Sequence, residues 1–296
     1  MTDRAKGMLA MIASAFGFSL MALFVRLCDD HGGGISCFQK SFFRNAVALI
    51  VAGAAFLRGS RPHGAIRVSP MLVLRSIFGT CGIFANFYAL GRIPIAEGQT
   101  LNKTAPFFTV VFAWAFFREK ASARQLAVLV LAFAGVVLIA KPGFAGEAAF
   151  PLAIGLLGGV CAGAAYACLR SLRRRGIDPA FIVFFFSMFS CAASLPFFAF
   201  DFAPMTAAQV AILSCAGISA AIGQFGITVA YGFAAPREIA VYDYSSIFFA
   251  AMLGFVFFGQ GPDALSFAGF ALVVVAAAML RSRIDEGRRK MVQFSL

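Results

Sequence analysis

Lys103 and Asp243 are ionisable residues in the interior of long apolar stretches, where a charge is costly and usually serves a function. At 1.5 Å per helical residue, each lies only about 5–6 Å from the midplane of a bilayer, on opposite sides of it. A cation and an anion across a central cavity suit a zwitterion, with its carboxylate toward Lys103 and its amine toward Asp243. The same placement suits a direct buried salt bridge that breaks and re-forms during gating. The sequence leaves both interpretations open.

Arg44 and Arg75 lie about two helical turns inside other apolar stretches. Each either anchors a buried polar network or faces a cavity and binds an anion. Four more ionisable residues lie within about a turn of the end of a stretch, from where their side chains can reach water: Arg26, Lys40, Glu97 and Glu238. Cations in these stretches outnumber anions five to three, which favours a ligand with a carboxylate or phosphate group.

Polar and aromatic residues accompany these charges and complete a candidate substrate site. Besides Lys103, Asp243, Arg44 and Arg75, its predicted members are Asn86, Tyr88, Asn102, Gln224, Tyr242 and Tyr244. Polar groups in lipid need partners, so many of them are expected to bond between helices instead.

Proton coupling would need a carboxylate that ionises beside a bound cation and releases it when the proton is picked up again. Asp243 is the first candidate, and Glu97 and Glu238 are the alternatives. A facilitative carrier or an exchanger needs no such group. Pro106 breaks an apolar stretch near its middle, so it is predicted to kink a helix and to serve as a hinge.

The composition is that of an integral membrane protein with several spans. Of 296 residues, 61% are hydrophobic and 13% are charged, and the mean hydropathy is +0.87. Apolar stretches long enough for a bilayer core lie at about 7–27, 38–57, 69–90, 95–117, 122–140, 151–171, 179–200, 207–232, 238–258 and 263–281. The predicted fold class is therefore an all-α integral membrane protein with ten transmembrane helices.

The two halves of the chain resemble each other. Residues 74–140 align without a gap on 215–281, so that Gly82 meets Gly223 and Glu97 meets Glu238. Five spans are an odd number, so the second copy must be inverted relative to the first. We therefore predict two inverted five-helix repeats, 1–145 and 146–296, the second ending in a basic cytoplasmic tail. Inverted repeats with a binding site near the midplane are typical of secondary transporters.

The basic residues are distributed unevenly over the predicted loops. Alternate loops receive eighteen Lys and Arg residues on one side and two on the other, which places both termini in the cytoplasm. This pattern attributes the net charge of +12 to membrane orientation and not to nucleic-acid binding. The two His and seven Cys residues form no cluster with metal-ligand spacing, so neither a metal nor a cofactor is predicted.

Several short motifs resemble the EamA-type ten-helix branch of the drug/metabolite transporter superfamily. They are Arg75, the Phe87-Tyr88-Ala89-Leu90 segment, Pro94-Ile95-Ala96, Pro106 and Arg118-Glu119-Lys120. The second repeat departs from this pattern, with Ile247 in place of the Pro and Gln260 in place of the Glu. The resemblance implies a carrier in the bacterial inner membrane that exports or exchanges metabolites such as amino acids by alternating access.

The predicted function is thus transport of a small metabolite, with an amino acid or a related carboxylate-bearing compound first. The alternative within transport is proton-coupled export of hydrophobic cationic drugs, which the abundant buried cations disfavour. An intramembrane lipid-modifying enzyme is the alternative of another class, but no nucleophile–base or metal set stands at one membrane depth. The expected partners are the metabolite, the lipid bilayer and, with coupling, protons; the carrier is a monomer or a homodimer.

Overall fold

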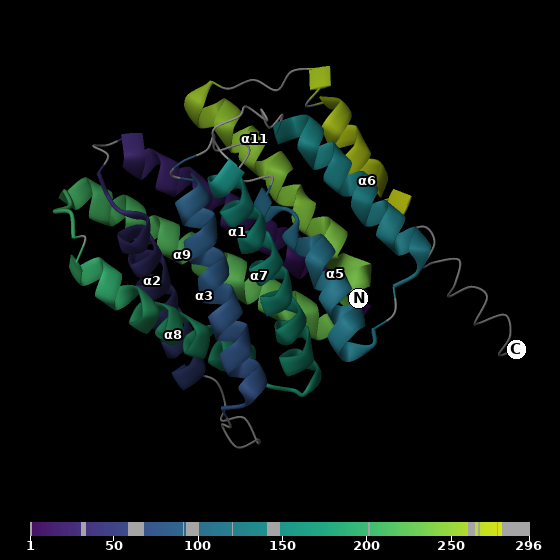
Figure 1. Cartoon of the computed structure of the whole chain (residues 1–296), viewed down its shortest axis with the longest axis horizontal. Coiled ribbons are helices and arrows are strands. Elements are labelled where there is room, and N and C mark those ends of the chain that lie inside the picture. Colours follow the sequence, from purple (N-terminus) through teal and green to yellow (C-terminus); the bar gives the residue numbers. More distant parts are fainter. Residues whose placement is uncertain are drawn as a thin grey trace, which may run out of the picture.

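The computed structural model shows helices packed side by side (Figure 1). It describes residues 2–30, 34–58, 68–90, 92, 101–119, 121–140, 149–200, 202–259, 264–265, 267–276 and 278–279. In chain order the elements are α1 (Asp3–Asp30), α2 (Cys37–Arg58), α3 (Pro70–Leu90), α5 (Ala105–Phe117), α6 (Ala123–Ala140), α7 (Ala149–Arg174), α8 (Pro179–Phe200), α9 (Ala207–Phe233), α10 (Pro236–Ile239), the 3₁₀ helix η1 (Ala240–Tyr244) and α11 (Ser245–Phe258). A further apolar helix covers Phe267–Ala276.

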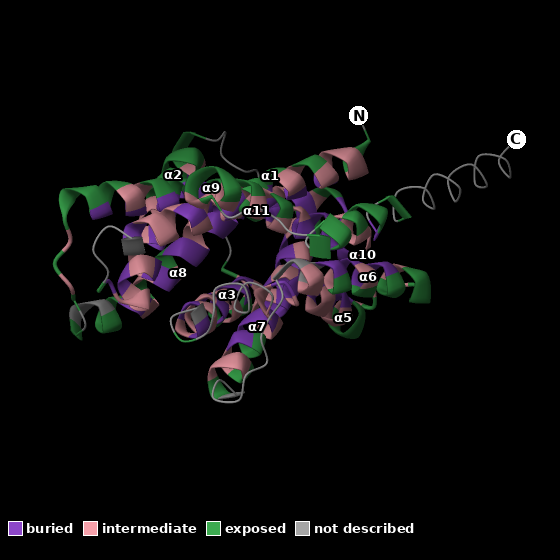
Figure 2. Ribbon diagram, turned by 90° about the horizontal axis from the view of Figure 1, so that it is seen from above, coloured by how far each residue is buried: buried purple, intermediate pink, exposed green. Residues whose placement is uncertain are grey.

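The described helices account for the ten predicted spans. Seven helical segments are long and apolar enough to cross a membrane, the last of them being Pro236–Phe258, which joins α10, η1 and α11. Three shorter apolar helices, Ala105–Phe117, Ala123–Gly135 and Phe267–Ala276, occupy the remaining predicted spans. Figure 2 shows buried residues on the inner faces of the helices and exposed residues on the outer ones. The protein is an all-α membrane protein. Helices suit its apolar outer surface because they satisfy their own backbone hydrogen bonds where the bilayer offers no water.

The two repeats pack crosswise. The first helix of the first repeat, α1, lies against α9 and α11, which are the third and fourth spans of the second repeat. The first helix of the second repeat, α7, lies in the same way against α3 and α5 of the first repeat. The second helices, α2 and α8, pack against each other. The first helix of each predicted repeat thus packs on the third and fourth spans of the other one. The predicted boundary between the repeats, between 145 and 146, lies outside the described residues, and their inversion stays a prediction.

Glycines permit the closest approaches between the repeats. A Cβ atom on Gly17 of α1 would stand 2.7 Å from the backbone nitrogen of Gly223 in α9. On the other side, Gly158 of α7 lies against Gly82 of α3, and Gly163 lies against the backbone of α5. Small residues let transmembrane helices approach closely enough for dispersion and Cα–H contacts to hold them together. The glycines Gly155, Gly158, Gly159 and Gly163 of α7 therefore have a packing role.

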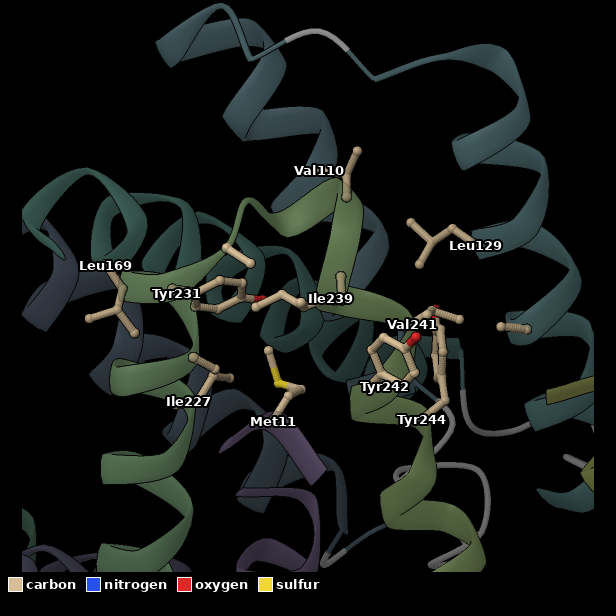
Figure 3. Packing of buried hydrophobic residues seen from close by; sticks show 14 of the residues in the cluster. Met11, Val110, Leu129, Leu169, Ile227, Tyr231, Ile239, Val241, Tyr242 and Tyr244 are labelled. Atoms are coloured by element: carbon tan, nitrogen blue, oxygen red, sulfur yellow. The ribbon is translucent and has the colours of Figure 1, made fainter. Parts of the chain in front are cut away.

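Most of the buried apolar core lies toward one end of the bundle, which we call the basic end. There α1 and α3 begin, α5 and α7 end, and the side chains of Arg170, Arg174 and Arg175 are found. The main apolar cluster contains Met11, Leu72, Val110, Leu169, Ile182, Ile227, Tyr231 and Ile239, among others (Figure 3). Toward the opposite end, the other described cluster contains only Cys28, Ile35 and Leu213 as fully buried members. The conformer is therefore the more tightly packed at the basic end.

Candidate functional site

Two spans are interrupted at corresponding places in the two repeats. In the first repeat, residues 101–102 are helical, Lys103 and Thr104 form a turn, and α5 starts at Ala105. In the second repeat, η1 separates α10 from α11 and carries Asp243. Interrupted helices near the midplane of inverted repeats are the usual place for a transporter's substrate and ion sites. The internal alignment already pairs these positions, because Asn102 falls on Asp243.

Pro106 does not act as the mid-helix kink that the sequence predicts. It lies in the first turn of α5, where proline is well tolerated because its missing N–H has no helical partner there. The interruption of this span precedes it, at Lys103 and Thr104, where the Thr104 hydroxyl donates a 2.6 Å hydrogen bond to the Leu101 carbonyl. Whether Pro106 is part of a hinge stays a prediction.

Lys103 and Asp243 form a direct ion pair across the two interrupted spans. Lys103 Nζ lies 3.3 Å from Asp243 Oδ2, and each side chain is only about a tenth exposed. The backbone around Asp243 is bonded in turn: the Ser246 hydroxyl donates to the Asp243 carbonyl, and the Ser19 hydroxyl of α1 donates to the Ser246 carbonyl. In this conformer the geometry is that of the salt bridge, and not that of two charges held apart around a zwitterion.

Three tyrosines lie within electrostatic range of the carboxylate of the ion pair. Asp243 interacts electrostatically with Tyr166 of α7, Tyr231 of α9 and Tyr244 of η1. Figure 3 shows Tyr242 and Tyr244 beside each other on η1, with Tyr231 on the neighbouring α9. The hydroxyl of Tyr244 is buried and has no hydrogen-bond partner in the part of the chain that the structure describes. Tyr242 and Tyr244, which the sequence predicts for the site, thus lie at the interruption of the span. Tyr231 was not predicted as a site residue, although its polar hydroxyl in an apolar stretch is visible in the sequence.

Arg75 of α3 is fully buried and reaches across the bundle. Its Nη2 donates a 3.1 Å hydrogen bond to Gln224 Oε1 of α9, which brings two predicted site residues together. Its guanidinium stacks on the ring of Phe186 in α8, 4.1 Å from the ring centre. Its Nε is buried, and no described residue offers it a hydrogen bond. The guanidinium has no carboxylate partner among the described residues.

Arg44 of α2 is also buried and bonded only to neutral groups. Its Nε lies 3.0 Å from the Met21 sulfur, and its Nη1 donates to Asn45 Oδ1 at 3.3 Å. Arg44 and Arg75 lie near enough for their like charges to interact, and both interact electrostatically with Tyr166. Four helices thus direct polar side chains to one region of the interior: α2, α3, α7 and α9.

Other predicted residues lie elsewhere. Tyr88 makes an edge-to-face contact with Phe150 and lies under the Arg92 guanidinium near the end of α3, away from η1. Asn86 lies two residues before Tyr88, and its buried Oδ1 has no hydrogen-bond partner among the described residues.

Asn102 is half-buried next to Lys103. Glu238 of α10 is near the basic end and 4.0 Å from Arg237, its sequence neighbour. Glu97 lies outside the described residues.

A second ionic network lies at the basic end. Glu119 Oε1, just after α5, accepts hydrogen bonds from Arg170 Nε at 3.4 Å and from Arg174 Nη1 at 3.0 Å. Arg170 Nη1 also donates a 2.9 Å bond to the Tyr231 carbonyl of α9. Arg170 therefore joins the ends of α5, α7 and α9. A pocket of about 300 Å³ lies beside it, lined also by Phe117, Ser171 and Arg175.

Comparison with known proteins agrees with this architecture. Residues 5–141 match the EamA-like transporter family. The predicted resemblance to EamA-type transporters is confirmed. The chain is 29% identical to the pseudopaline exporter CntI of Pseudomonas aeruginosa strain UCBPP-PA14, over 95% of this chain and 97% of that protein. It is 25% identical to a riboflavin transporter of Rhizobium johnstonii, over 73% of this chain and 71% of the relative.

A solved crystal structure shares the fold. It superposes with a TM-score of 0.75 over 92% of this chain and 96% of its own, at 20% sequence identity.

The family match and the named relatives show that the protein is a transporter and not an enzyme. It crosses the inner membrane several times, and its substrate is a small molecule.

Proposed function

We propose that the protein is a secondary transporter that exports or exchanges a small, carboxylate-bearing metabolite by alternating access. The observation that carries this proposal is the buried Lys103–Asp243 ion pair, because it joins the interrupted spans of two inverted repeats. A buried ion pair that can be replaced by contacts to a substrate provides a switch between conformers. The name of the pseudopaline exporter supports export of a metabolite.

The finer features of this proposal follow from the sequence pattern. The repeats span 1–145 and 146–296, and both termini face the cytoplasm, so that the basic end is the cytoplasmic one. If transport is coupled to protons, Asp243 takes up the proton, because protonation would release Lys103 and open the pair. Ten helices suffice for a monomer, and a homodimer is the other expected form.

Counterflow into liposomes tests the proposal. Vesicles that contain the purified protein are loaded separately with amino acids, carboxylates, nucleosides or hydrophobic cations, and exchange of trapped for external labelled compound is measured. Exchange with the amino-acid or carboxylate pool should fall at least tenfold in Lys103→Ala and in Asp243→Ala. Lys6→Ala is the matched control, since Lys6 belongs to an exposed ion pair with Asp3.

The outcomes separate the parts of the proposal. Exchange that survives in both central variants would remove the ion pair from the mechanism while leaving a carrier. Exchange with hydrophobic cations alone would favour drug export instead. The absence of exchange with every pool would contradict the proposed mechanism of transport.

A further inference from the structure

The buried centre of the bundle holds more positive than negative charge. Arg44, Arg75 and Lys103 are cations with at most about a tenth of their surface exposed, and Asp243 is the one described anion near them. Because Asp243 is paired with Lys103, two guanidinium groups are left without a carboxylate among the described residues. The uncompensated charge comes entirely from the first repeat, on α2 and α3.

A buried guanidinium bonded only to neutral groups is an unusual arrangement. Burial removes the hydration of the ion, and only an opposite charge or a full set of hydrogen bonds offsets that loss. Arg75 has one amide acceptor and an aromatic face, and its Nε has no hydrogen-bond partner among the described residues. Arg44 has one sulfur and one amide oxygen, which are weak or neutral acceptors. Both groups thus keep donors that a carboxylate or phosphate oxygen would satisfy.

We infer that the transported compound carries two acidic groups, one bound by Arg75 beside Gln224 and the other by Arg44. This inference rests on the proposed transport function and specifies its substrate class. Two anionic groups would neutralise the two unpaired cations, and the planar guanidinium fork matches carboxylate and phosphate oxygens. Lys103 is not the anion site in this conformer, because Asp243 already neutralises it.

The position of the two arginines also explains why both repeats are needed. Gln224 of α9 and Phe186 of α8 hold Arg75 from the second repeat, while Tyr166 of α7 lies within electrostatic range of both guanidinium groups. A dianion bound there would contact groups from both repeats, so its binding and release would be coupled to their relative movement.

Counterflow with matched probes tests this inference. Labelled glutarate and glutamate, which carry two carboxylates, are compared with monomethyl glutarate and glutamine, which are close in shape and carry one. The parent protein should exchange at least one of the two dicarboxylates ten times faster than its matched control compound. In Arg44→Gln and Arg75→Gln that preference should fall to less than twofold. Arg26→Gln should keep it, because Arg26 lies over a Phe ring as Arg75 does but near the end of α1.

Two further measurements distinguish loss of substrate recognition from a folding defect and from binding of a lipid headgroup. Arg75→Lys keeps the charge and loses the fork, so we expect a weakened but measurable preference in this variant. The thermal midpoint of the purified protein should rise with the exchanged dianion in neutral phosphatidylcholine vesicles. A rise that requires phosphatidylglycerol and not the soluble dianion would assign the arginines to a lipid headgroup and overturn the inference.

The remaining outcomes are equally decisive. Exchange of neutral or singly charged compounds alone would overturn the dianion inference and leave the transporter intact. A preference for dianions that survives in both Arg→Gln variants would place the acidic groups elsewhere and would also overturn it. No exchange with any compound, including the broader pools above, would count against the proposed function itself.

Discussion

Removing the Asp243 carboxylate should destabilise the protein strongly, because it leaves the Lys103 ammonium buried without a counter-ion. At the observed 3.3 Å separation, an effective dielectric constant of about 20 gives an attraction of about 5 kcal/mol. Breaking one side of a buried pair typically costs about 3–5 kcal/mol, since the remaining charge keeps its desolvation penalty. Asp243→Ala should therefore lower the unfolding free energy by about 3–5 kcal/mol.

The assay is thermal unfolding of the purified protein, followed by the fluorescence of Trp114, its single tryptophan. With about 2 °C per kcal/mol for a chain of this size, the midpoint should fall by about 6–10 °C in Asp243→Ala. Asp3→Ala is the matched control: it breaks a 3.1 Å ion pair with Lys6 that water surrounds, so the change should stay within about 1 kcal/mol.

A double variant separates charge burial from the loss of other contacts. Lys103→Met together with Asp243→Ala removes both charges, so most of the lost stability should return while exchange activity stays low. If Asp243→Ala alone unfolds at the midpoint of the parent, the ammonium is hydrated and the argument from burial is refuted. If the double variant is as unstable as the single one, the loss comes from packing around η1 and not from charge.

Three further changes test other parts of the structure. Gly17→Ala should cost about 1–3 kcal/mol of unfolding free energy, because the new methyl group would meet backbone atoms of α9, whereas Gly53→Ala, with only a Phe ring edge 3.4 Å away, should be nearly neutral in the same unfolding assay. Glu119→Gln removes the anion that two arginines share at the basic end, so the ends of the helices there should separate more easily. In a variant whose only cysteine is the buried Cys168, maleimide should then label this cysteine several-fold faster. An unchanged labelling rate would show that the network does not hold these helix ends together. Thr206→Ala removes the capping box of α9 and should lower the unfolding midpoint by the equivalent of about 1 kcal/mol; full retention of the midpoint would mean that water replaces the cap.

The spans could be predicted from the sequence because the bilayer imposes a length and a polarity that each segment satisfies by itself. The predicted stretch 207–232 agrees closely with α9, and 179–200 has the bounds of α8. The repeat was predictable for a related reason: glycines such as Gly82 and Gly223 recur where two backbones must approach. These features depend on local composition or on spacing along the chain.

The site was predictable as a set of residue types and only partly as a place. A charge in an apolar stretch is visible in the sequence, so Lys103, Asp243, Arg44 and Arg75 were all found. Tyr88 was grouped with them although it lies near the end of α3, because helical spacing does not show how deep a ring lies in the bundle. Pro106 was predicted to break its span, and the span is interrupted just before it, at Lys103 and Thr104, so that this proline lies in the first turn of α5.

By itself, the sequence determined that this chain spans a membrane as two similar halves and that charges lie within its spans. The tertiary structure decided how those charges are shared: Asp243 pairs with Lys103, while Arg75 meets an amide and a ring, and Arg44 an amide and a sulfur. The physical reason is that ion pairing falls steeply with distance in a medium of low polarity. Which cation obtains the carboxylate therefore depends on crosswise packing of helices that lie more than a hundred residues apart in the chain.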